Sequence, residues 1–247
     1  MNIKRATSGI TGLDPLIEGG FPQGKSYLIT GEPGTGKSIF CMQFVVKGLE
    51  EGEKAVYVAI DDKPADIIEQ AASLGWDLPP YIEKKQLLIL DASSYFGTGM
   101  GGGKDKSVDV QKVIVDLSSY VQRMEAKRVV IDPAGPLVLL RDSTSRIQDQ
   151  ARMLVHSLQT NLGTTNLLTT YSVPRIGEKS VHGIEEYLVA GTIVLEMVWM
   201  NNRFIRTIII EKMRSTAMEL GQYEFRIVKG EGIVVQPPLE DKLTSSL

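Results

Sequence analysis

The chain has 247 residues, 43% of them hydrophobic and 23% charged, which is enough to bury a substantial core in one large or two small domains. Its 27 basic and 30 acidic residues give a formal charge of −3, which argues against a nucleic-acid or anionic-membrane partner. One cysteine excludes an internal disulfide. Because the sequence shows neither a signal-peptide pattern nor an apolar stretch of about 20 residues, we expect a cytoplasmic protein without a membrane partner.

Strand-like and helix-like segments alternate along the first two thirds of the chain. Short apolar runs typical of buried strands occupy 25–30, 55–60, 87–92, 128–133 and 166–172. Apolar residues at helical spacing between them occupy 38–49, 65–74, 110–124 and 147–158. This β–α alternation predicts an α/β fold with a mostly parallel central sheet flanked by helices. A glycine-rich stretch at 97–103 is expected to be a surface loop.

The pattern changes after Gly191. Segments 192–200 and 203–214 are typical of a β-hairpin that turns at Asn201-Asn202, and a second hairpin is predicted for 223–238. We therefore expect antiparallel hairpins at the C-terminal side of the sheet. The sequence predicts one domain over residues 1–236, followed by a tail at 237–247.

A phosphate-binding motif follows the first predicted strand and opens the first predicted helix. The sequence GEPGTGKS at Gly31–Ser38 matches G-x-x-x-x-G-K-[ST] in full, and we call this segment the phosphate loop. Its glycines let backbone N–H groups surround phosphate oxygens, Lys37 reaches the β- and γ-phosphates, and the Ser38 hydroxyl is a Mg²⁺ ligand. The alternative is a glycine-rich turn that fits by chance. The candidate nucleotide-binding residues here are Gly31, Glu32, Pro33, Gly34, Thr35, Gly36, Lys37, Ser38 and Ile39.

Carboxylates follow two of the other predicted strands. Asp132 ends an apolar strand, where P-loop NTPases carry the acidic residue that holds the Mg²⁺ shell; the alternative is an ordinary Asp-Pro turn. Asp61 and Asp62 end the second strand, at the edge that faces the ligand in α/β sheets. There they could orient and deprotonate an attacking water, although Asp62 could instead cap the next helix.

Four linked segments resemble the KaiC family of RecA-like P-loop ATPases over roughly residues 5–236. They are TSGITGLDPLIEGGFPQGKSYLITGEPGTGKS, YVAIDDKPADIIEQAASLGWDL, GIEEYLVAGTIVLEM and IIIEKMRSTAMELGQYEFRIVKGEGIVVQP. The resemblance implies a RecA-like ATPase that assembles as a homohexameric ring with ATP between subunits and Mg²⁺ as cofactor. It also implies a regulatory or signalling role with a protein partner, whose identity the sequence does not show.

The resemblance assigns roles to residues that spacing alone leaves open. Asp61 and Asp62 match the catalytic acidic pair, and Ser73 matches a position on the base side of the nucleotide. The segment that reaches the neighbour's nucleotide corresponds to Lys212, Met213, Arg214 and Thr216, where the cations Lys212 and Arg214 could stabilise phosphoryl charge in hydrolysis. Without the resemblance, these two cations would be interpreted as a solvated strand end.

Several residues depart from the family pattern. The acidic pair is Asp-Asp where Glu-Glu is usual, and Ser215 and Met218 replace a usual glycine and a frequent histidine. Since Asp is one methylene shorter than Glu, the sequence predicts slow hydrolysis, with an ATP-dependent assembly switch as the main alternative. An autokinase is a weaker alternative, because Leu188 cannot accept phosphate. A DNA-dependent recombination ATPase is another, which the acidic charge balance disfavours.

Overall fold

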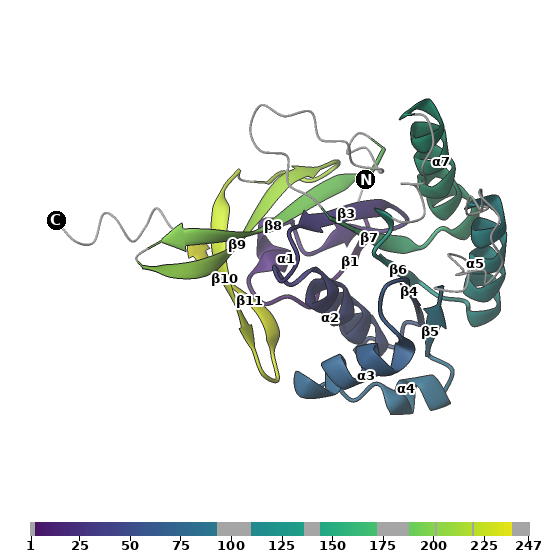
Figure 1. Cartoon of the computed structure of the whole chain (residues 1–247), viewed down its shortest axis with the longest axis horizontal. Helices are drawn as coiled ribbons and strands as arrows, with labels where there is room; N and C mark the ends of the chain where they lie inside the picture. Colours follow the sequence, from purple (N-terminus) through teal and green to yellow (C-terminus); the bar gives the residue numbers. More distant parts are fainter. Residues whose placement is uncertain are drawn as a thin grey trace, which may run out of the picture.

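The computed structural model describes residues 3–92, 110–135, 144–171, 188–200, 202–218 and 220–238 (Figure 1). Its helices are α1 (Leu13–Leu16), α2 (Lys37–Glu50), α3 (Pro64–Ser73), α4 (Pro79–Glu83), α5 (Val110–Met124), α7 (Thr144–Ser157) and the π-helix η2 (Leu158–Leu162). Its strands are β1 (Arg5–Ala6), β2 (Phe21–Pro22), β3 (Ser26–Gly31), β4 (Ala55–Ala59), β5 (Leu87–Asp91), β6 (Arg128–Asp132), β7 (Thr165–Tyr171), β8 (Gly191–Met200), β9 (Arg203–Met213), β10 (Gln222–Val228) and β11 (Gly232–Pro238).

Nine strands form one central sheet in the order β11-β10-β9-β8-β3-β7-β6-β4-β5. The strands from β8 to β5 in this order run parallel, and β9, β10 and β11 extend the sheet by antiparallel pairing. The predicted α/β class, the mostly parallel sheet and the C-terminal antiparallel hairpins are therefore confirmed. Because parallel strands end at the same edge, the residues that follow β3, β4, β6 and β7 meet there.

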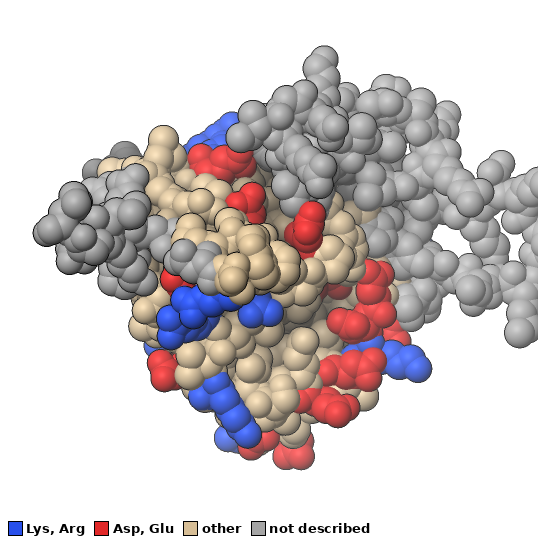
Figure 2. Space-filling model, turned by 60° about the vertical axis from the view of Figure 1, so that its left-hand side comes forward, with Lys and Arg blue, Asp and Glu red and all other residues tan. Residues whose placement is uncertain are grey.

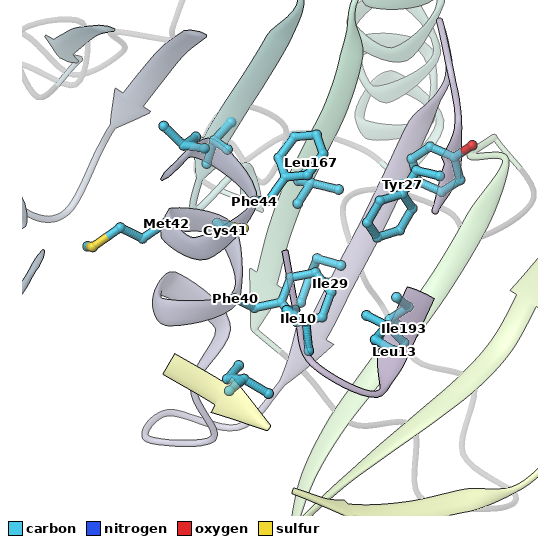
Figure 3. Packing of buried hydrophobic residues seen from close by; sticks show 14 of the residues in the cluster. Ile10, Leu13, Tyr27, Ile29, Phe40, Cys41, Met42, Phe44, Leu167 and Ile193 are labelled. Atoms are coloured by element: carbon cyan, nitrogen blue, oxygen red, sulfur yellow. The ribbon is translucent and has the colours of Figure 1, made fainter. Parts of the chain in front are cut away.

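Two hydrophobic cores cover the two faces of the sheet. On β3 the side chains of Tyr27 and Ile29 enter one core while Leu28 enters the other, as the two-residue period of a strand requires. Helix α2 fills the first core with Phe40 and Phe44, which pack beneath β3 and the N-terminal segment (Figure 3). Helices α5 and α7 cover the opposite face (Figure 1). The helix that follows the phosphate loop is thereby anchored against the sheet.

The buried Gln43 joins α2 to both ends of the described chain. Its side-chain amide nitrogen donates hydrogen bonds to the carbonyl oxygens of Gly9 and Glu231, each at 2.8 Å. Its amide oxygen accepts a 2.7 Å hydrogen bond from the backbone N–H of Ile233. The β10–β11 hairpin and the N-terminal segment are therefore both tied to the phosphate-loop helix.

Among the residues whose burial the structure describes, Arg128 at the start of β6 has the largest fully buried side chain. Its guanidinium group forms ion pairs with Glu53 and, at 3.0 Å, with Glu51. It also donates to the carbonyl oxygens of Thr7 and Phe44, at 2.7 and 2.8 Å. A buried cation is tolerated only with such partners, so these contacts fix the C-terminal end of α2 against the sheet.

The longer elements lie where the sequence predicts them, within a few residues at their ends. The sequence did not predict α1, β1, β2, α4 or η2, which are short. The glycine-rich stretch 97–103 and residues 239–247 of the expected tail lie outside the described residues. No helix in the described segments is long and apolar enough to cross a membrane.

Replacing Arg128 by methionine should lower the free energy of unfolding by about 3 kcal/mol, because the carbonyl oxygens of Thr7 and Phe44 lose their buried donor. Urea denaturation followed by circular dichroism measures this loss. The control is Lys54→Met, which breaks the exposed Lys54–Glu125 pair and should cost less than about 1 kcal/mol. Equal losses in the two variants would contradict the role assigned to Arg128.

Candidate functional site

The phosphate loop joins β3 to α2 in a conformation that needs glycine. Gly31 has a φ of 154°, and a side chain there would collide with the carbonyl oxygen of Leu195 on β8. Gly36 has a φ of 111° at the N-terminus of α2. The Thr35 hydroxyl donates a 2.8 Å hydrogen bond to the Glu32 carbonyl and closes the loop. The loop therefore presents the first backbone N–H groups of a long helix, which is a favourable place for an anion.

Lys37 lies inside the loop rather than in solvent, with 7% of its surface exposed. Its ammonium group donates to the carbonyl oxygens of Gly31 and Glu32, at 2.8 and 3.0 Å, and lies 5.1 Å from the ring centroid of Tyr171. Burial lowers the pKa of this ammonium group, and the nearby Asp132 carboxylate opposes that change. The charge is thus held at the mouth of the loop by neutral oxygens that a phosphate could replace.

Asp132 is buried at the end of β6 and is hydrogen-bonded from both neighbouring strands. The Tyr57 hydroxyl on β4 donates to it at 2.6 Å, and the Thr169 hydroxyl on β7 donates to its other oxygen. Burial and the Asp132 charge raise the pKa of Tyr57 well above its usual value, so Tyr57 stays a donor. The network holds the carboxylate in one orientation beside the phosphate loop.

Asp61 and Asp62 follow β4 at the same edge. Asp61 accepts a 2.7 Å hydrogen bond from the Tyr171 hydroxyl. Burial raises the pKa of Asp62, and the negative charges of Asp132 and Asp61 raise it further. The alternative interpretation of Asp62 as the cap of α3 is wrong, because Lys63 occupies the cap position.

A cavity of about 280 Å³ lies over the phosphate loop. Its lining contains the predicted residues Pro33, Gly34, Gly36, Lys37, Ser38, Ile39 and Asp132. It also contains four residues that sequence reasoning missed, namely Gln70, Tyr171, Arg206 and Ile227. Both Ser38 and Asp132 line this cavity and carry side-chain oxygen atoms, which are the ligands that Mg²⁺ prefers, so the residue types fit the predicted metal.

The cavity differs from expectation in several details. The predicted acidic pair Asp61–Asp62 is not among its lining residues, although Asp61 is hydrogen-bonded to Tyr171, which is. The lining also lacks Gly31, Glu32 and Thr35 of the phosphate loop.

Ser73 does not line the cavity either; the Ser73 hydroxyl donates a 2.7 Å hydrogen bond to the carbonyl of Gln70, and Gln70 itself lines the cavity from α3. Arg206 on β9 donates to the Gly34 carbonyl at 3.3 and 3.4 Å, so a cation touches the phosphate loop within the same chain. No motif in the sequence points to Arg206, because only the strand order brings β9 near the loop.

The predicted cations Lys212 and Arg214 lie at the opposite edge of the sheet from the phosphate loop. In the strand register, Gly31 at the phosphate loop pairs with Leu195 on β8, whereas Met213 pairs with Gly191 at the beginning of β8. There Lys212 donates a 2.9 Å hydrogen bond to the Val189 carbonyl. The backbone N–H of Arg214 bonds the Ala190 carbonyl at 2.7 Å, and the Thr216 hydroxyl accepts a 2.9 Å bond from Arg5. The structure therefore does not bring this segment to the chain's own phosphate loop.

The raised pKa of Asp62 predicts how stability depends on pH. The folded chain retains this proton to a higher pH than the unfolded chain does, so ionisation of Asp62 opposes folding. As pH rises from 3.8, the ordinary pKa, through the raised value, the contribution of Asp62 to the free energy of unfolding should fall. Asp62→Asn should remove that fall, which denaturation across the pH range measures. Parallel curves for the two proteins would contradict this prediction.

Comparisons with known proteins agree on one family. The family model described as the KaiC ATPase matches residues 6–240. A UPF0273 protein of Methanopyrus kandleri is 33% identical over 242 residues, which cover 96% of this chain and 94% of that protein. The circadian clock oscillator protein KaiC of Synechococcus elongatus is 33% identical over 237 residues. This match covers 95% of this chain but 44% of that protein, so the chain spans less than half the length of this relative.

A solved structure shows the same fold. The crystal structure of a KaiC-like protein from Pyrococcus horikoshii matches with a TM-score of 0.81 and 35% sequence identity, covering 96% of this chain and 100% of the other. The parallel sheet, the phosphate loop and the antiparallel extension are thus arranged as in a KaiC-like RecA fold. The chain belongs to the KaiC family of ATPases.

Proposed function

We propose that this protein binds Mg²⁺-ATP and hydrolyses it slowly between the subunits of a ring-shaped homo-oligomer, a homohexamer by resemblance. The observation that carries the proposal is the convergence of the phosphate loop, Lys37, Asp132 and the Asp61–Asp62 pair at one edge of the sheet. A phosphate-binding loop and a cluster of carboxylates at one place are the parts that phosphoryl transfer to water requires. The sequence predicts a domain over 1–236 with a tail at 237–247, but Pro237 and Pro238 belong to β11, so we propose that the domain continues through Pro238.

The bound triphosphate would displace the internal bonds of Lys37. Its ammonium group would exchange the carbonyl oxygens of Gly31 and Glu32 for phosphate oxygens, which are stronger, charged acceptors. The Ser38 hydroxyl would hold Mg²⁺, with Asp132 holding the metal's water shell, and the metal would neutralise charge on the phosphates. Asp132 is already oriented for this by Tyr57 and Thr169.

The acidic pair would prepare the water that attacks the γ-phosphate. A carboxylate with a raised pKa is a stronger base than an ordinary aspartate, which suits Asp62 to accept the proton of that water. Asp61 would orient the same water from a fixed position beside Tyr171. The shorter reach of aspartate supports slow turnover.

The position of Lys212 and Arg214 supports a site shared between subunits. These residues lie at the edge of the sheet opposite the phosphate loop, so they would meet a nucleotide only on a second copy. A contact of one edge with the opposite edge of a neighbour is heterologous, and such contacts form a ring when the rotation between neighbours closes and an open filament when it does not. We place Lys212, Met213, Arg214 and Thr216 at the neighbour's nucleotide.

We further propose a regulatory or signalling role for the assembly, read by a protein partner. Figure 2 shows basic and acidic side chains on one face with a broad uncharged surface between them, rather than a basic stripe. The chain's excess of acidic over basic residues supports a protein partner over a nucleic acid, which would need a positively charged track.

Lys37→Ala should lower the rate of ATP hydrolysis by about a hundredfold or more, because the developing phosphoryl charge loses a preorganised cation. Phosphate release from Mg²⁺-ATP measures the rate. The control is Lys47→Ala on the same helix, whose ammonium group pairs with Glu51 and should be dispensable for hydrolysis. Hydrolysis by Lys37→Ala at the rate of the unchanged protein would overturn the proposal.

A mixture of two inactive variants should regain activity if the site is shared. Lys37→Ala lacks the phosphate-loop cation and Arg214→Ala lacks the cation donated to the neighbour, so each variant alone should be inactive. In an equal mixture, about a quarter of the heterologous interfaces would combine an intact loop with an intact arginine. Recovery of about that share of the original rate is expected in a phosphate-release assay after mixing and reassembly. Absence of any recovery would argue that Arg214 does not act on a neighbour.

A further inference from the structure

Tyr171 connects the phosphate loop to the acidic pair. It is the last residue of β7, and in the strand register it lies directly opposite Gly31, the first residue of the phosphate loop. The Lys37 ammonium group lies 5.1 Å from the centroid of its ring. Its hydroxyl donates a 2.7 Å hydrogen bond to Oδ2 of Asp61. One side chain thus contacts both groups that the proposed hydrolysis needs at the γ-phosphate.

The backbone of Tyr171 lies in a paired strand and that of Asp61 does not, while both side chains are exposed. Tyr171 is held by the pairing of β7 with β3, whereas Asp61 lies in the connection after β4. An exposed aspartate samples several rotamers unless a partner selects one. The Tyr171 hydroxyl selects the rotamer in which Oδ2 faces β7, and Oδ1 still has lone pairs for a water.

We infer that Tyr171 is a positioning residue for hydrolysis, which holds the Asp61 carboxylate toward the phosphate loop. This inference rests on the proposed ATPase function. The inference gives a physical reason why the shorter Asp61–Asp62 pair can support hydrolysis. Tyr171 contacts both Lys37 of the phosphate loop and the Asp61 carboxylate, which without this bond could rotate away from the loop. Tyr171 itself exchanges no proton with the substrate; burial and its bond to Asp61 raise its pKa, so it remains a donor.

The test is a double-mutant cycle on ATP hydrolysis with Tyr171→Phe and Asp61→Asn. The phenylalanine keeps the ring beside Lys37 and removes only the hydroxyl. We expect Tyr171→Phe to lower kcat by about tenfold, because Asp61 loses its fixed orientation, while the Kd for ATP changes by less than about twofold. In the Asp61→Asn background, the same change should have no further effect on kcat, since the tyrosine acts through Asp61.

The matched control is Tyr120→Phe on α5, which removes a tyrosine hydroxyl on the other face of the sheet and should leave kcat unchanged. Melting temperatures of all variants check that folding is intact. Independent, multiplicative effects of Tyr171→Phe and Asp61→Asn would overturn the inference, as would a rise in the Kd for ATP at constant kcat.

The cycle separates this inference from the proposed function. If the unchanged protein hydrolyses ATP in a Lys37-dependent manner but Tyr171→Phe is equally active, the inference alone fails. If the unchanged protein shows no Lys37-dependent hydrolysis, the proposed function fails and the role of Tyr171 fails with it.

Discussion

The arrangement of the site depends on one buried carboxylate. Asp132 is 8% exposed, and a charge at such a place is stable only with hydrogen-bond donors around it. Tyr57 on β4 and Thr169 on β7 provide them from the two strands that flank β6. The hydrogen bonds that stabilise this charge therefore also link the carboxyl-terminal ends of β4, β6 and β7. Asp61 follows β4 and Tyr171 ends β7, so both lie next to the strand ends that these bonds link.

The sequence predicts the framework of the fold well because its elements have strong patterns. The buried parallel strands are continuous apolar runs, and α2, α3, α5 and α7 are long enough to show a helical period. The two-residue strands β1 and β2 and the four-residue helix α1 are too short to have a period. They form because the core beside α2 needs a cover, which is a property of the tertiary structure rather than of the local sequence.

The candidate site likewise contains residues that the sequence predicts and residues that only the tertiary structure reveals. Motif spacing predicts Lys37, and the place of the acidic strand-end residue in P-loop NTPases predicts Asp132. The rule that ligands meet the carboxyl ends of strands points to the Asp61–Asp62 pair. Neither motif spacing nor the strand-end rule predicts Tyr171 and Arg206, because their nearness to the phosphate loop depends on the order of the strands in the sheet. Strand β7 follows β6 in the chain but lies between β6 and β3 in the sheet. The family resemblance did not reveal them either, since its motifs do not include these two positions.

The β8–β9 hairpin extends from one edge of the sheet to the other. Arg206, nearer its turn, lies beside the phosphate loop, and Arg214, at its open end, lies far from that loop. Under the proposed sharing of sites, an open row of subunits always leaves one phosphate loop, at one end of the row, without the cations of a neighbour. That site is incomplete. A dimer would then hold a single complete site, and only a closed ring would give every subunit one. Specific activity should therefore rise with the length of the assembly and become independent of protein concentration once rings have closed, so that closure itself would act as a threshold for turnover.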